Sequence, residues 1–377
     1  MTVRGLHRGS GLLAGLAMAL AGLPAAAAER PSYQTELDAV VRAGAVSTSV
    51  EVVSAGARWQ GASGVGDLRT GRPAPVNGRV RIGSTTKTFV ATVLLQLVGE
   101  GRLRLEDSVE RHLPQLVPGG DAITVRQLLS HTSGLFDYTE DQQAVPLTGT
   151  AFLEQTRFRT FKPHELVKIA TRHEPYFPPG TSFRYSNTGY VLAGLVIHKV
   201  TGRPYGEEIE RRILRPLGLT RTTVPGTSTA VPGPHPHGYL TVRTGDSIEK
   251  VDVTRMNPSW AFSAGEMIST PYDLNRFFQA LLGGKLLRPA QLQTMRTAVA
   301  TDPQGVAYGM GLWSQKRPCG VKVWGHGGRL PGFKTTVLRS DDGERALTLM
   351  YSPSTTNGVP EFLASEELID KVFCGKQ

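Results

Sequence analysis

The stretch Ser84-Thr85-Thr86-Lys87 places a hydroxyl and an amine three residues apart. It stands directly before an apolar run that contains Phe89, Val90, Val93, Leu94, Leu97 and Val98. Residues three apart lie on the same face of a helix, so the amine of Lys87 can reach the proton of the Ser84 hydroxyl. The N-terminus of a helix also offers unpaired backbone N–H groups to an oxyanion. The stretch therefore predicts a buried helix that carries one half of an acyl-transfer site at its start.

The same spacing recurs at Ser247 and Lys250. That copy follows the polar residues Thr244-Gly245-Asp246 and has no apolar run behind it, so we interpret it as a solvated loop. Because the pattern occurs twice, Ser84 is distinguished only by its helical context and by partners that are distant in the sequence.

The first 28 residues have the pattern of a secretory signal peptide. Arg4 and Arg8 precede an apolar run from residue 11 to residue 23, which is followed by Pro24 and four alanines. We expect cleavage near Ala28 and a secreted, extracellular protein. A membrane anchor is the alternative, but the run is shorter than the roughly 20 apolar residues that span a bilayer, so no stable membrane span is expected.

The net charge is +10, and it falls to +8 without the two arginines of the leader. No run of Lys and Arg, and no basic stretch interleaved with aromatic residues, supports nucleic-acid binding. For an exported protein the charge favours association with an anionic cell wall, or simply a solvated surface. His235-Pro236-His237 lies in a Pro/Gly loop without a third ligand, so no metal and no other cofactor are expected. We expect a monomer.

The chain contains two cysteines, Cys319 and Cys374. In an oxidising compartment a single pair usually forms a disulfide. The closed loop would contribute about 4 kcal/mol in the chain-entropy model. A catalytic thiol or two free thiols are the alternatives, but neither cysteine has a histidine as a close neighbour in the sequence.

The apolar patterns predict an α/β (α+β) fold with a single catalytic domain at 29–377. Strands are expected at 46–54, 57–62, 308–313, 322–324, 333–339 and 346–351. Helices are expected at 33–44, 163–172, 187–201, 205–216, 271–282 and 360–373, with Thr124 as an N-cap before Val125. We therefore expect one antiparallel sheet, built from both termini (29–105 and 286–377) and flanked by helices, with a large, mostly helical insertion at 106–285.

Tyr185-Ser186-Asn187 follows a Pro/Gly turn and precedes a second apolar helix. A Tyr185 phenolate is a candidate general base if a nearby cation such as Lys87 lowers its pKa. Asn187 offers a donor for a substrate carbonyl. The alternative is structural, with Ser186 or Asn187 as an N-cap and Tyr185 as a core aromatic residue.

His326-Gly327-Gly328 ends an apolar, strand-like segment. The two glycines allow a substrate backbone to lie against the strand edge, and His326 is a candidate proton donor or charge. An unperturbed histidine changes its charge at about pH 6.5, so we expect activity to change through that range. A tight turn with an incidental histidine is the alternative. His131 is interpreted as a residue that makes a structural hydrogen bond.

Three motifs occur in this order along the chain: Ser84-x-x-Lys87, Tyr185-x-Asn187 and His326-x-Gly328. Together they resemble the motifs of the penicillin-recognising serine enzymes. The similarity is greatest to the exported serine D-alanyl-D-alanine carboxypeptidases related to class C β-lactamases, and it extends over roughly residues 33–376. Further segments that resemble this family are Leu128-Leu129-Ser130-His131-Thr132-Ser133-Gly134-Leu135, Ser263-Ala264-Gly265, Tyr308-Gly309-Met310-Gly311-Leu312 and Phe373-Cys374-Gly375-Lys376.

The resemblance implies a β-lactamase/transpeptidase-like fold and an acyl-enzyme on Ser84. It also implies that Lys87 forms a network with Tyr185 and Asn187, in which Tyr185 is the base and the acid to the leaving group. The backbone N–H groups of Ser84 and Arg329 would form the oxyanion hole.

This chain departs from that family around the expected substrate site. Gly327 stands where relatives usually carry a hydroxyl residue, Arg329 stands at another hydroxyl position, and Trp313 replaces an arginine that helps to hold the substrate carboxylate. Arg329 can bind a carboxylate bidentately. Trp260 is expected to line the cleft, with a position in the core as the alternative. The candidate substrate-binding residues are therefore Gly327, Gly328, Arg329, Trp260 and Trp313.

The leading hypothesis is an exported serine hydrolase with D-alanyl-D-alanine carboxypeptidase activity on peptidoglycan stem peptides. A related esterase, D-amino-acid peptidase or β-lactamase is the alternative, so the expected substrate is a peptide or a β-lactam-like small molecule. A catalytically silent penicillin-binding or wall-binding protein is disfavoured, because a binding module has no need of Lys87. No Gly-x-Ser-x-Gly nucleophile elbow is present.

Overall fold

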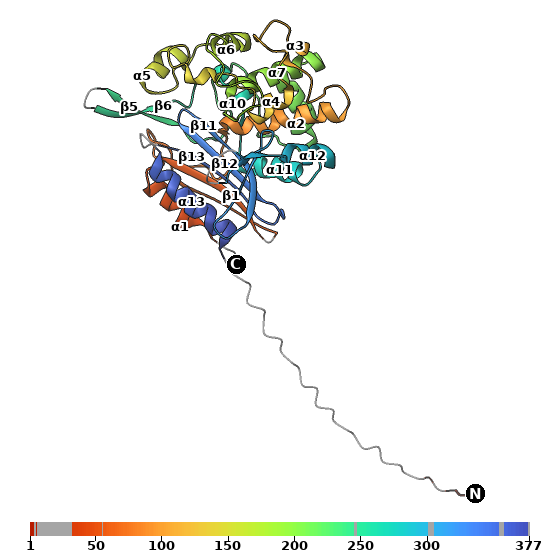
Figure 1. The fold of residues 1–377 in the computed structure, drawn as a ribbon. Coiled ribbons are helices and arrows are strands. Elements are labelled where there is room, and N and C mark those ends of the chain that lie inside the picture. Colours follow the sequence, from red (N-terminus) through yellow and green to blue (C-terminus); the bar gives the residue numbers. More distant parts are fainter. Residues whose placement is uncertain are drawn as a thin grey trace. The chain divides into compact units, whose positions relative to one another are not determined.

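Strands from both ends of the chain form one nine-stranded antiparallel sheet in the computed structural model, which describes residues 1–3, 5, 32–54, 56–244, 247–300, 305–353 and 358–375. The strands are β1 (Ser47–Ser54), β2 (Ala57–Asp67), β3 (Arg72–Pro73), β8 (Val299–Ala300), β9 (Ala307–Tyr308), β10 (Trp313–Lys316), β11 (Lys322–Leu330), β12 (Phe333–Ser340) and β13 (Ala346–Ser352). Across the sheet they follow the order β3-β2-β1-β13-β12-β11-β10-β9-β8. The two ends of the chain meet where β1 pairs with β13, and Val50 lies opposite Leu349. The sheet expected from the sequence is therefore confirmed (Figure 1).

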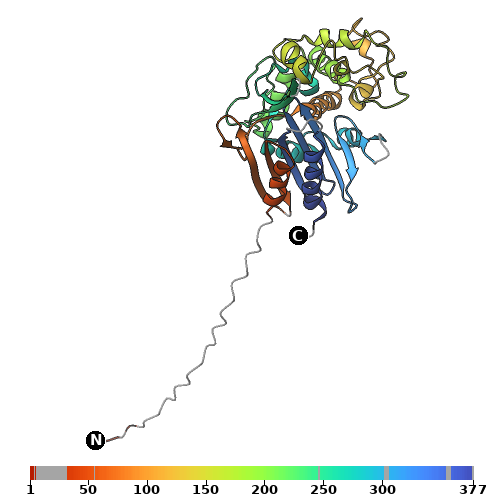
Figure 2. The same ribbon diagram turned by 90° about the vertical axis from the view of Figure 1, so that its left-hand side faces the viewer.

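Helices cover both faces of this sheet. They are α1 (Gln34–Arg42), α2 (Thr86–Gly99), α3 (Val109–His112), α4 (Val125–Ser130), α5 (Gly149–Ala151), α6 (Pro163–Ala170), α7 (Asn187–Thr201), α8 (Tyr205–Ile209), α9 (Arg215–Leu217), α10 (Phe262–Gly265), α11 (Pro271–Leu282), α12 (Pro289–Arg296) and α13 (Val359–Cys374). Short 3-10 helices are η1 (Gly83–Thr85), η2 (Tyr138–Glu140) and η5 (Pro258–Trp260). Short π-helical segments are η3 (Phe152–Thr156) and η4 (Glu210–Leu214). Helices α1 and α13 pack against each other on one face, and α11 lies against β1, β12 and β13 on the other (Figures 1 and 2). Because successive side chains of a strand point to opposite faces, β12 contributes Leu338 to the core under α1 and α13 and Val337 to the core under α11.

The mostly helical part contacts α2 through α7 and α10. Helix α2 is apolar on nearly all sides and almost wholly buried, as expected of a helix inside a core. Helix α4 begins at the predicted cap: the side chain of Thr124 accepts the backbone N–H of Gln127, and the Gln127 side chain accepts that of Thr124.

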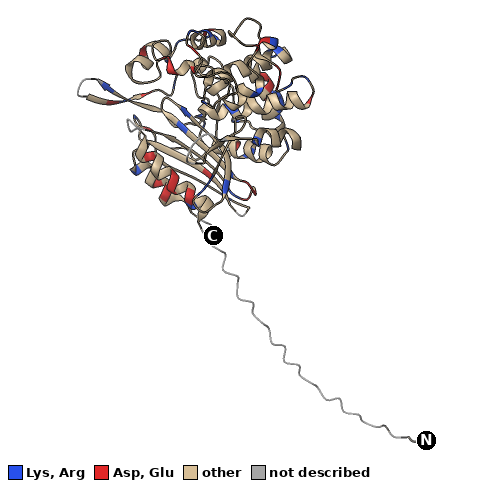
Figure 3. Ribbon diagram, viewed as in Figure 1, with Lys and Arg blue, Asp and Glu red and all other residues tan. Residues whose placement is uncertain are grey.

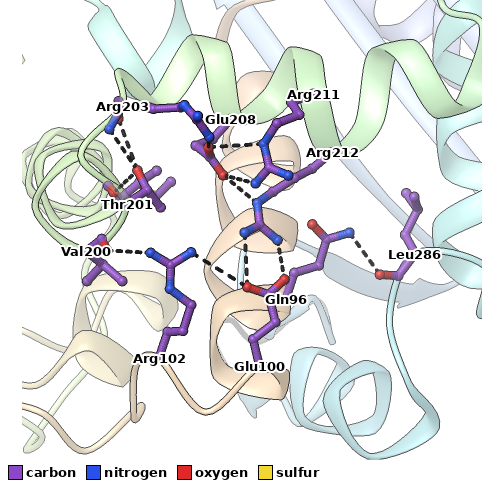
Figure 4. Close-up of polar contacts among 11 residues, drawn as sticks. Gln96, Glu100, Arg102, Val200, Thr201, Arg203, Glu208, Arg211, Arg212 and Leu286 are labelled. Carbon is purple, nitrogen blue, oxygen red and sulfur yellow. Dashed lines mark hydrogen bonds and ion pairs between the residues drawn. The ribbon is translucent and has the colours of Figure 1, made fainter.

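A buried ion-pair network fixes the far end of α2 (Figure 4). The carboxylate of Glu208 on α8 is fully buried and accepts hydrogen bonds from Arg211 and Arg212. Arg212 also donates to Glu100, the residue that follows α2, at 3.0 Å. The C-terminal end of α2 is therefore held to the helical part, while its N-terminal end faces the candidate site.

Two elements differ from the sequence prediction. The strand expected at 308–313 is divided into β9 and β10, because Gly311 takes a left-handed conformation (φ +65°) and the N–H of Gly309 donates to the carbonyl of Leu312 at 2.7 Å. A hairpin of β5 (Tyr239–Thr244) and β6 (Ser247–Asp252) lies inside the part expected to be mostly helical. The second Ser-x-x-Lys copy is therefore in an exposed strand and not in a loop.

Residues Ser32–Gln377 form one compact unit. The signal peptide expected at 1–28, and the domain boundary at 29, lie outside the described residues, apart from residues 1–3 and 5. Among the described residues, every helix is too short or too polar to traverse a lipid bilayer. A disulfide between Cys319 and Cys374 ties the turn after β10 to the end of α13.

Candidate active site

Ser84 lies in the turn η1, and Lys87 lies in the first turn of α2. The Lys87 amine donates a hydrogen bond of 3.0 Å to the Ser84 hydroxyl. The turn is pressed against β11, since a Cβ atom on Gly83 would lie 2.6 Å from the backbone nitrogen of Arg329. Gly83 also has a positive φ of 51°, so glycine is required there for two reasons. The backbone nitrogen of Arg329 thus lies directly beside the residue that precedes Ser84.

Lys87 is fully buried, and three acceptors surround its amine. Besides the Ser84 hydroxyl they are the Asn187 side-chain carbonyl and the Ala264 backbone carbonyl, each at 2.7 Å. Burial lowers the pKa of Lys87 to about 7, although the charge of Asp137 acts in the opposite direction. Near neutral pH the amine can lose one proton, keep two N–H donors for Asn187 and Ala264, and direct its lone pair to Ser84. This geometry suits a general base.

Tyr185 lies beside the same pair. Its hydroxyl interacts with Ser84, and its ring centroid is 4.9 Å from the Lys87 nitrogen. The ring of His131 stacks on it at 4.1 Å, while His131 Nδ1 accepts the backbone N–H of Ser186, which is the structural hydrogen bond expected. Tyr185 was a candidate base on the condition that a nearby cation lowers its pKa, but burial and the charge of Asp137 raise that pKa. Tyr185 is therefore a neutral phenol at neutral pH, able to donate a proton but not poised as the first base.

Asn187, the first residue of α7, lies between Lys87 and Asp137. Its Nδ2 donates to Asp137 Oδ2 at 2.8 Å and to Thr139 Oγ1 at 3.2 Å. Both amide protons are therefore used, which corrects the expectation that Asn187 donates to a substrate carbonyl. Ser186 occupies the N-cap position, but its side chain does not cap the helix.

Sequence reasoning missed Asp137. The carboxylate is buried, at 4% exposure, behind Asn187. Its only signal in the sequence is an acidic residue within the otherwise apolar segment 135–138.

His326 is buried beside Tyr308, whose ring in turn lies edge-on to that of Tyr185. Its Nδ1 lies 2.6 Å from the carbonyl oxygen of Gly327, and its Nε2 lies 3.0 Å from the hydroxyl of Tyr308. Because a carbonyl can only accept, Nδ1 carries the proton and Nε2 accepts from Tyr308. Burial and the positive charge of Lys87 lower the pKa of His326 to about 3. The charge change expected at about pH 6.5 is therefore corrected, since His326 stays neutral well below that pH.

The two glycines after His326 have different surroundings. A Cβ atom on Gly328 would lie 1.8 Å from the carbonyl oxygen of Ile82, so this glycine lets β11 pack against η1. A Cβ atom on Gly327 would meet only the carbonyl oxygen of Thr335, at an ordinary 3.5 Å. Neither glycine lines the cavity at Ser84. Strand β10 pairs with β11 only as far as Gly325, so the described backbone beyond it has no strand partner on that side.

A cavity of about 560 Å³ opens at Ser84. Trp260 lines it and is also buried in the core, so both interpretations of this residue hold. Arg329 and Lys334 are the charged residues among the described ones that line it. The expected substrate role of Trp313 is corrected: it packs against the core under α1 and α13, on the sheet face away from Ser84.

A larger cavity of about 1040 Å³ lies between α7, α8 and the segment 218–226. It contains no residue of the Ser84 network. Glu266 borders it, and burial raises the pKa of this carboxyl group, which accepts a hydrogen bond from Tyr205, to about 8. In the part of the chain that the structure describes, no group of three or more His, Cys, Asp or Glu residues could hold a metal ion.

A buried amine in contact with a hydroxyl, on a turn that packs against the backbone nitrogen of Arg329, is the geometry of a serine acyl-transfer enzyme with a lysine partner. The beta-lactamase family model matches residues 33–366. The chain therefore belongs to the beta-lactamase family of serine hydrolases and has the β-lactamase/transpeptidase-like fold.

Three similar proteins show where the chain stands within this family. Penicillin-binding protein 4* of Bacillus subtilis is 28% identical over 299 residues, which cover 76% of this chain and 63% of that protein, so the match spans less than two thirds of its length. The structure of the D-stereospecific amidohydrolase from Streptomyces sp. is 43% identical, with a TM-score of 0.83 over 92% of this chain and 98% of that chain. The D-amino acid amidase from Ochrobactrum anthropi SV3 is 30% identical, with a TM-score of 0.79 over 90% and 96% of the two chains.

Proposed function

We propose that this chain is a D-stereospecific amide hydrolase that forms an acyl-enzyme on Ser84. The observation that carries the chemistry is the 3.0 Å contact between the Ser84 hydroxyl and a Lys87 amine whose pKa is about 7. The substrate class is supported by the similar proteins from Streptomyces and Ochrobactrum, which are named as a D-stereospecific amidohydrolase and a D-amino acid amidase. We therefore place a D-amino-acid amide or peptide ahead of the D-alanyl-D-alanine terminus that the motifs favoured.

In the acylation step, neutral Lys87 takes the proton of Ser84 while Oγ bonds to the substrate carbonyl carbon. The charge that develops on the carbonyl oxygen is stabilised by the backbone N–H groups of Ser84 and Arg329. When the C–N bond breaks, the leaving amine takes a proton from the phenol of Tyr185, which regains one from Lys87. Water then attacks the carbonyl carbon of the acyl-enzyme and gives a proton to Lys87. The ester bond to Ser84 breaks, Lys87 returns the proton to Ser84 Oγ, and the carboxylic acid product leaves.

The second candidate is the D-alanyl-D-alanine carboxypeptidase activity on peptidoglycan stem peptides. Arg329 and Lys334 favour it, because two cations at the cavity attract a terminal carboxylate. The residues at 327 and 313 disfavour it, because Gly327 has no hydroxyl and Trp313 lies on the other face of the sheet. An esterase or β-lactamase activity uses the same acyl-enzyme chemistry and differs only in the leaving group.

Hydrolysis assays separate these activities. The purified protein is incubated with D-phenylalanine amide, L-phenylalanine amide, a peptide that ends in D-Ala-D-Ala, a penicillin and a simple ester, with Ser84→Ala as the control. We expect ammonia release from the D-amide, little from the L-amide, and none from the variant. Release of D-Ala without cleavage of the D-amide would establish the second candidate instead, and rapid penicillin turnover would indicate a β-lactamase.

We further propose that the protein acts outside the cell, as an extracellular monomer, after removal of residues 1–28. The disulfide between Cys319 and Cys374 supports an oxidising compartment. Association with an anionic cell wall is supported by the net charge of +8 that remains without the two arginines of residues 1–28. In the view of Figure 3, Lys and Arg are spread over the helical part and the sheet, so we expect such binding to be diffuse and reversed by salt. Fractionation of the producing cells and light scattering test the location and the oligomeric state.

A further inference from the structure

Asp137 is a buried carboxylate that is linked to the amine of Lys87 through a single amide group. Its Oδ1 accepts the backbone N–H of Thr139 at 3.0 Å and the Thr139 hydroxyl at 2.9 Å. Its Oδ2 accepts Nδ2 of Asn187 at 2.8 Å, and Oδ1 of that amide accepts the Lys87 amine at 2.7 Å. Asp137, Asn187, Lys87 and Ser84 thus form one continuous chain of hydrogen bonds.

The charge of Asp137 decides which way the amide of Asn187 points. An ionised carboxylate only accepts hydrogen bonds, so the amide must present Nδ2 to Asp137 and Oδ1 to Lys87. In the opposite orientation, two oxygens would face each other on one side and two nitrogen donors on the other. A carboxylate at this position therefore excludes the orientation in which Asn187 would push the amine away.

We propose that Asp137 is a positioning residue that locks the amide of Asn187 and thereby holds the amine of Lys87 against Ser84. The proposal rests on the acyl-enzyme at Ser84 and not on the identity of the substrate. A purely structural role is the competing explanation, because Asp137 also caps the turn η2 through Thr139.

The pH dependence of Ser84 reactivity distinguishes the two roles, because a purely structural role of Asp137 would not change it. The titratable groups that face the amine of Lys87 are Tyr185 before α7, Tyr190 on α7, His131 after α4, His326 from β11 and Asp137 before η2. Asp137 is the negative one among them, and its charge favours the protonated amine. Removing that charge shifts the pH dependence of Ser84 reactivity toward lower pH.

The test is the rate at which a fluorophosphonate probe labels Ser84 in the full chain between pH 5 and 9. In Asp137→Asn, the new NH2 group faces either Nδ2 of Asn187 or the backbone N–H of Thr139, so a donor meets a donor in either orientation. We expect labelling to slow by about 100-fold, as for a small misplacement of a catalytic group, with its midpoint at lower pH than in the wild type.

A double exchange, Asp137→Asn with Asn187→Asp, restores a donor opposite each acceptor and moves the charge next to Lys87. We expect it to recover thermal stability relative to the single variant and to move the midpoint above that of the wild type. The two variants therefore shift the midpoint in opposite directions, and the double exchange keeps the test open if Asp137→Asn does not fold.

Tyr176→Phe is the matched control, because the Tyr176 hydroxyl accepts the backbone N–H of Asp137 at 3.0 Å without touching its carboxylate. It should leave the midpoint unchanged. Equal midpoints in the wild type, the single variant and the double exchange would overturn the proposal, as would a wild type that shows no pH-dependent labelling at Ser84. If Ser84 is labelled as expected but no D-amide is cleaved, the proposed substrate fails while the role of Asp137 stands.

Discussion

The backbone carbonyl of Ala264 accepts a 2.7 Å hydrogen bond from the amine of Lys87, although the two residues are 177 positions apart. Helix α10 therefore supplies one acceptor, and Asn187 from α7 supplies another. With two N–H bonds directed in this way, the remaining position of the amine points at Ser84. Helices α2, α7 and α10 thus together orient the amine of Lys87. This explains how a buried lysine can still exchange a proton with Ser84.

Replacing Lys87 tests whether its amine is the base. Arginine keeps a positive charge but does not lose its proton at neutral pH, so Lys87→Arg should be as inactive as Lys87→Ala. We expect kcat/KM for D-phenylalanine amide to fall by about 10²–10⁴-fold in both variants. In the wild type the rate should rise with pH through about 7, because the protonated amine cannot accept the Ser84 proton. Rates between pH 5 and 9 provide the measurement, and substantial activity in Lys87→Arg would assign the base elsewhere.

His326 should make the protein less stable in acid without setting the pH dependence of its activity. Its pKa is about 3 in the folded protein and about 6.5 in an unfolded chain. Below pH 6.5 the unfolded state binds a proton that the folded state does not, so stability is lost as the pH falls toward 3.

We expect the wild type to lose about 3 kcal/mol more than His326→Gln between pH 7 and pH 4, measured by urea unfolding at each pH. His164→Gln, at an exposed position, is the control and should behave as the wild type. Equal losses in the wild type and His326→Gln would contradict a neutral, buried His326, and the acid limb of activity should have the same midpoint in both.

The parts of the site that lie close together in the sequence could be predicted, and those that depend on burial or strand register could not. Ser84 and Lys87 lie one helical turn apart, so their contact follows from local spacing alone. Asp137 meets Asn187 across 50 positions, and no local pattern reveals that contact. Trp313 was assigned to the substrate site, but it pairs with Gly325 on the opposite sheet face, and a change of register by one residue reverses the face of a strand residue.

The directions of the pKa shifts could not be predicted from the sequence either, because they too depend on burial. Placing Tyr185 near a cation suggested a lower pKa, yet desolvation of a buried phenol acts more strongly and raises it. The pKa of His326 is lowered for the same reason, because burial disfavours its charged form. Sequence patterns show which groups gather, but the extent of their burial emerges only when the helical part closes over α2.

Gly328 should be far less replaceable than Gly327. In Gly328→Ala the new methyl group would lie 1.8 Å from the carbonyl oxygen of Ile82, so β11 and the turn that carries Ser84 must separate. We expect a loss of about 1–3 kcal/mol in stability, together with slower acylation of Ser84. Gly327→Ala is the matched control, with its methyl group 3.5 Å from Thr335, and its stability should change by no more than about 1 kcal/mol. Urea unfolding and probe labelling of both variants decide the matter, and equal effects would show that the contact with Ile82 is not limiting.

Glu208 should contribute more to stability than any exposed ion pair near it. Its side chain is fully buried between Arg211 and Arg212, so Glu208→Ala removes the acceptor of Arg211 and leaves Arg212 with Glu100 alone (Figure 4). We expect this to cost about 1.5–3 kcal/mol, as for the loss of hydrogen bonds to a charged group. Glu210→Ala is the matched control: Glu210 is 51% exposed and pairs with the exposed Arg215, so its loss should cost at most about 1 kcal/mol. The network holds the C-terminal end of α2, which is remote from Ser84. In Glu208→Ala the fluorophosphonate probe should therefore still label Ser84 at low temperature, and this labelling should be lost on mild heating. If urea unfolding shows similar losses of stability for the two variants, the buried Glu208 contributes no more to stability than an exposed ion pair does.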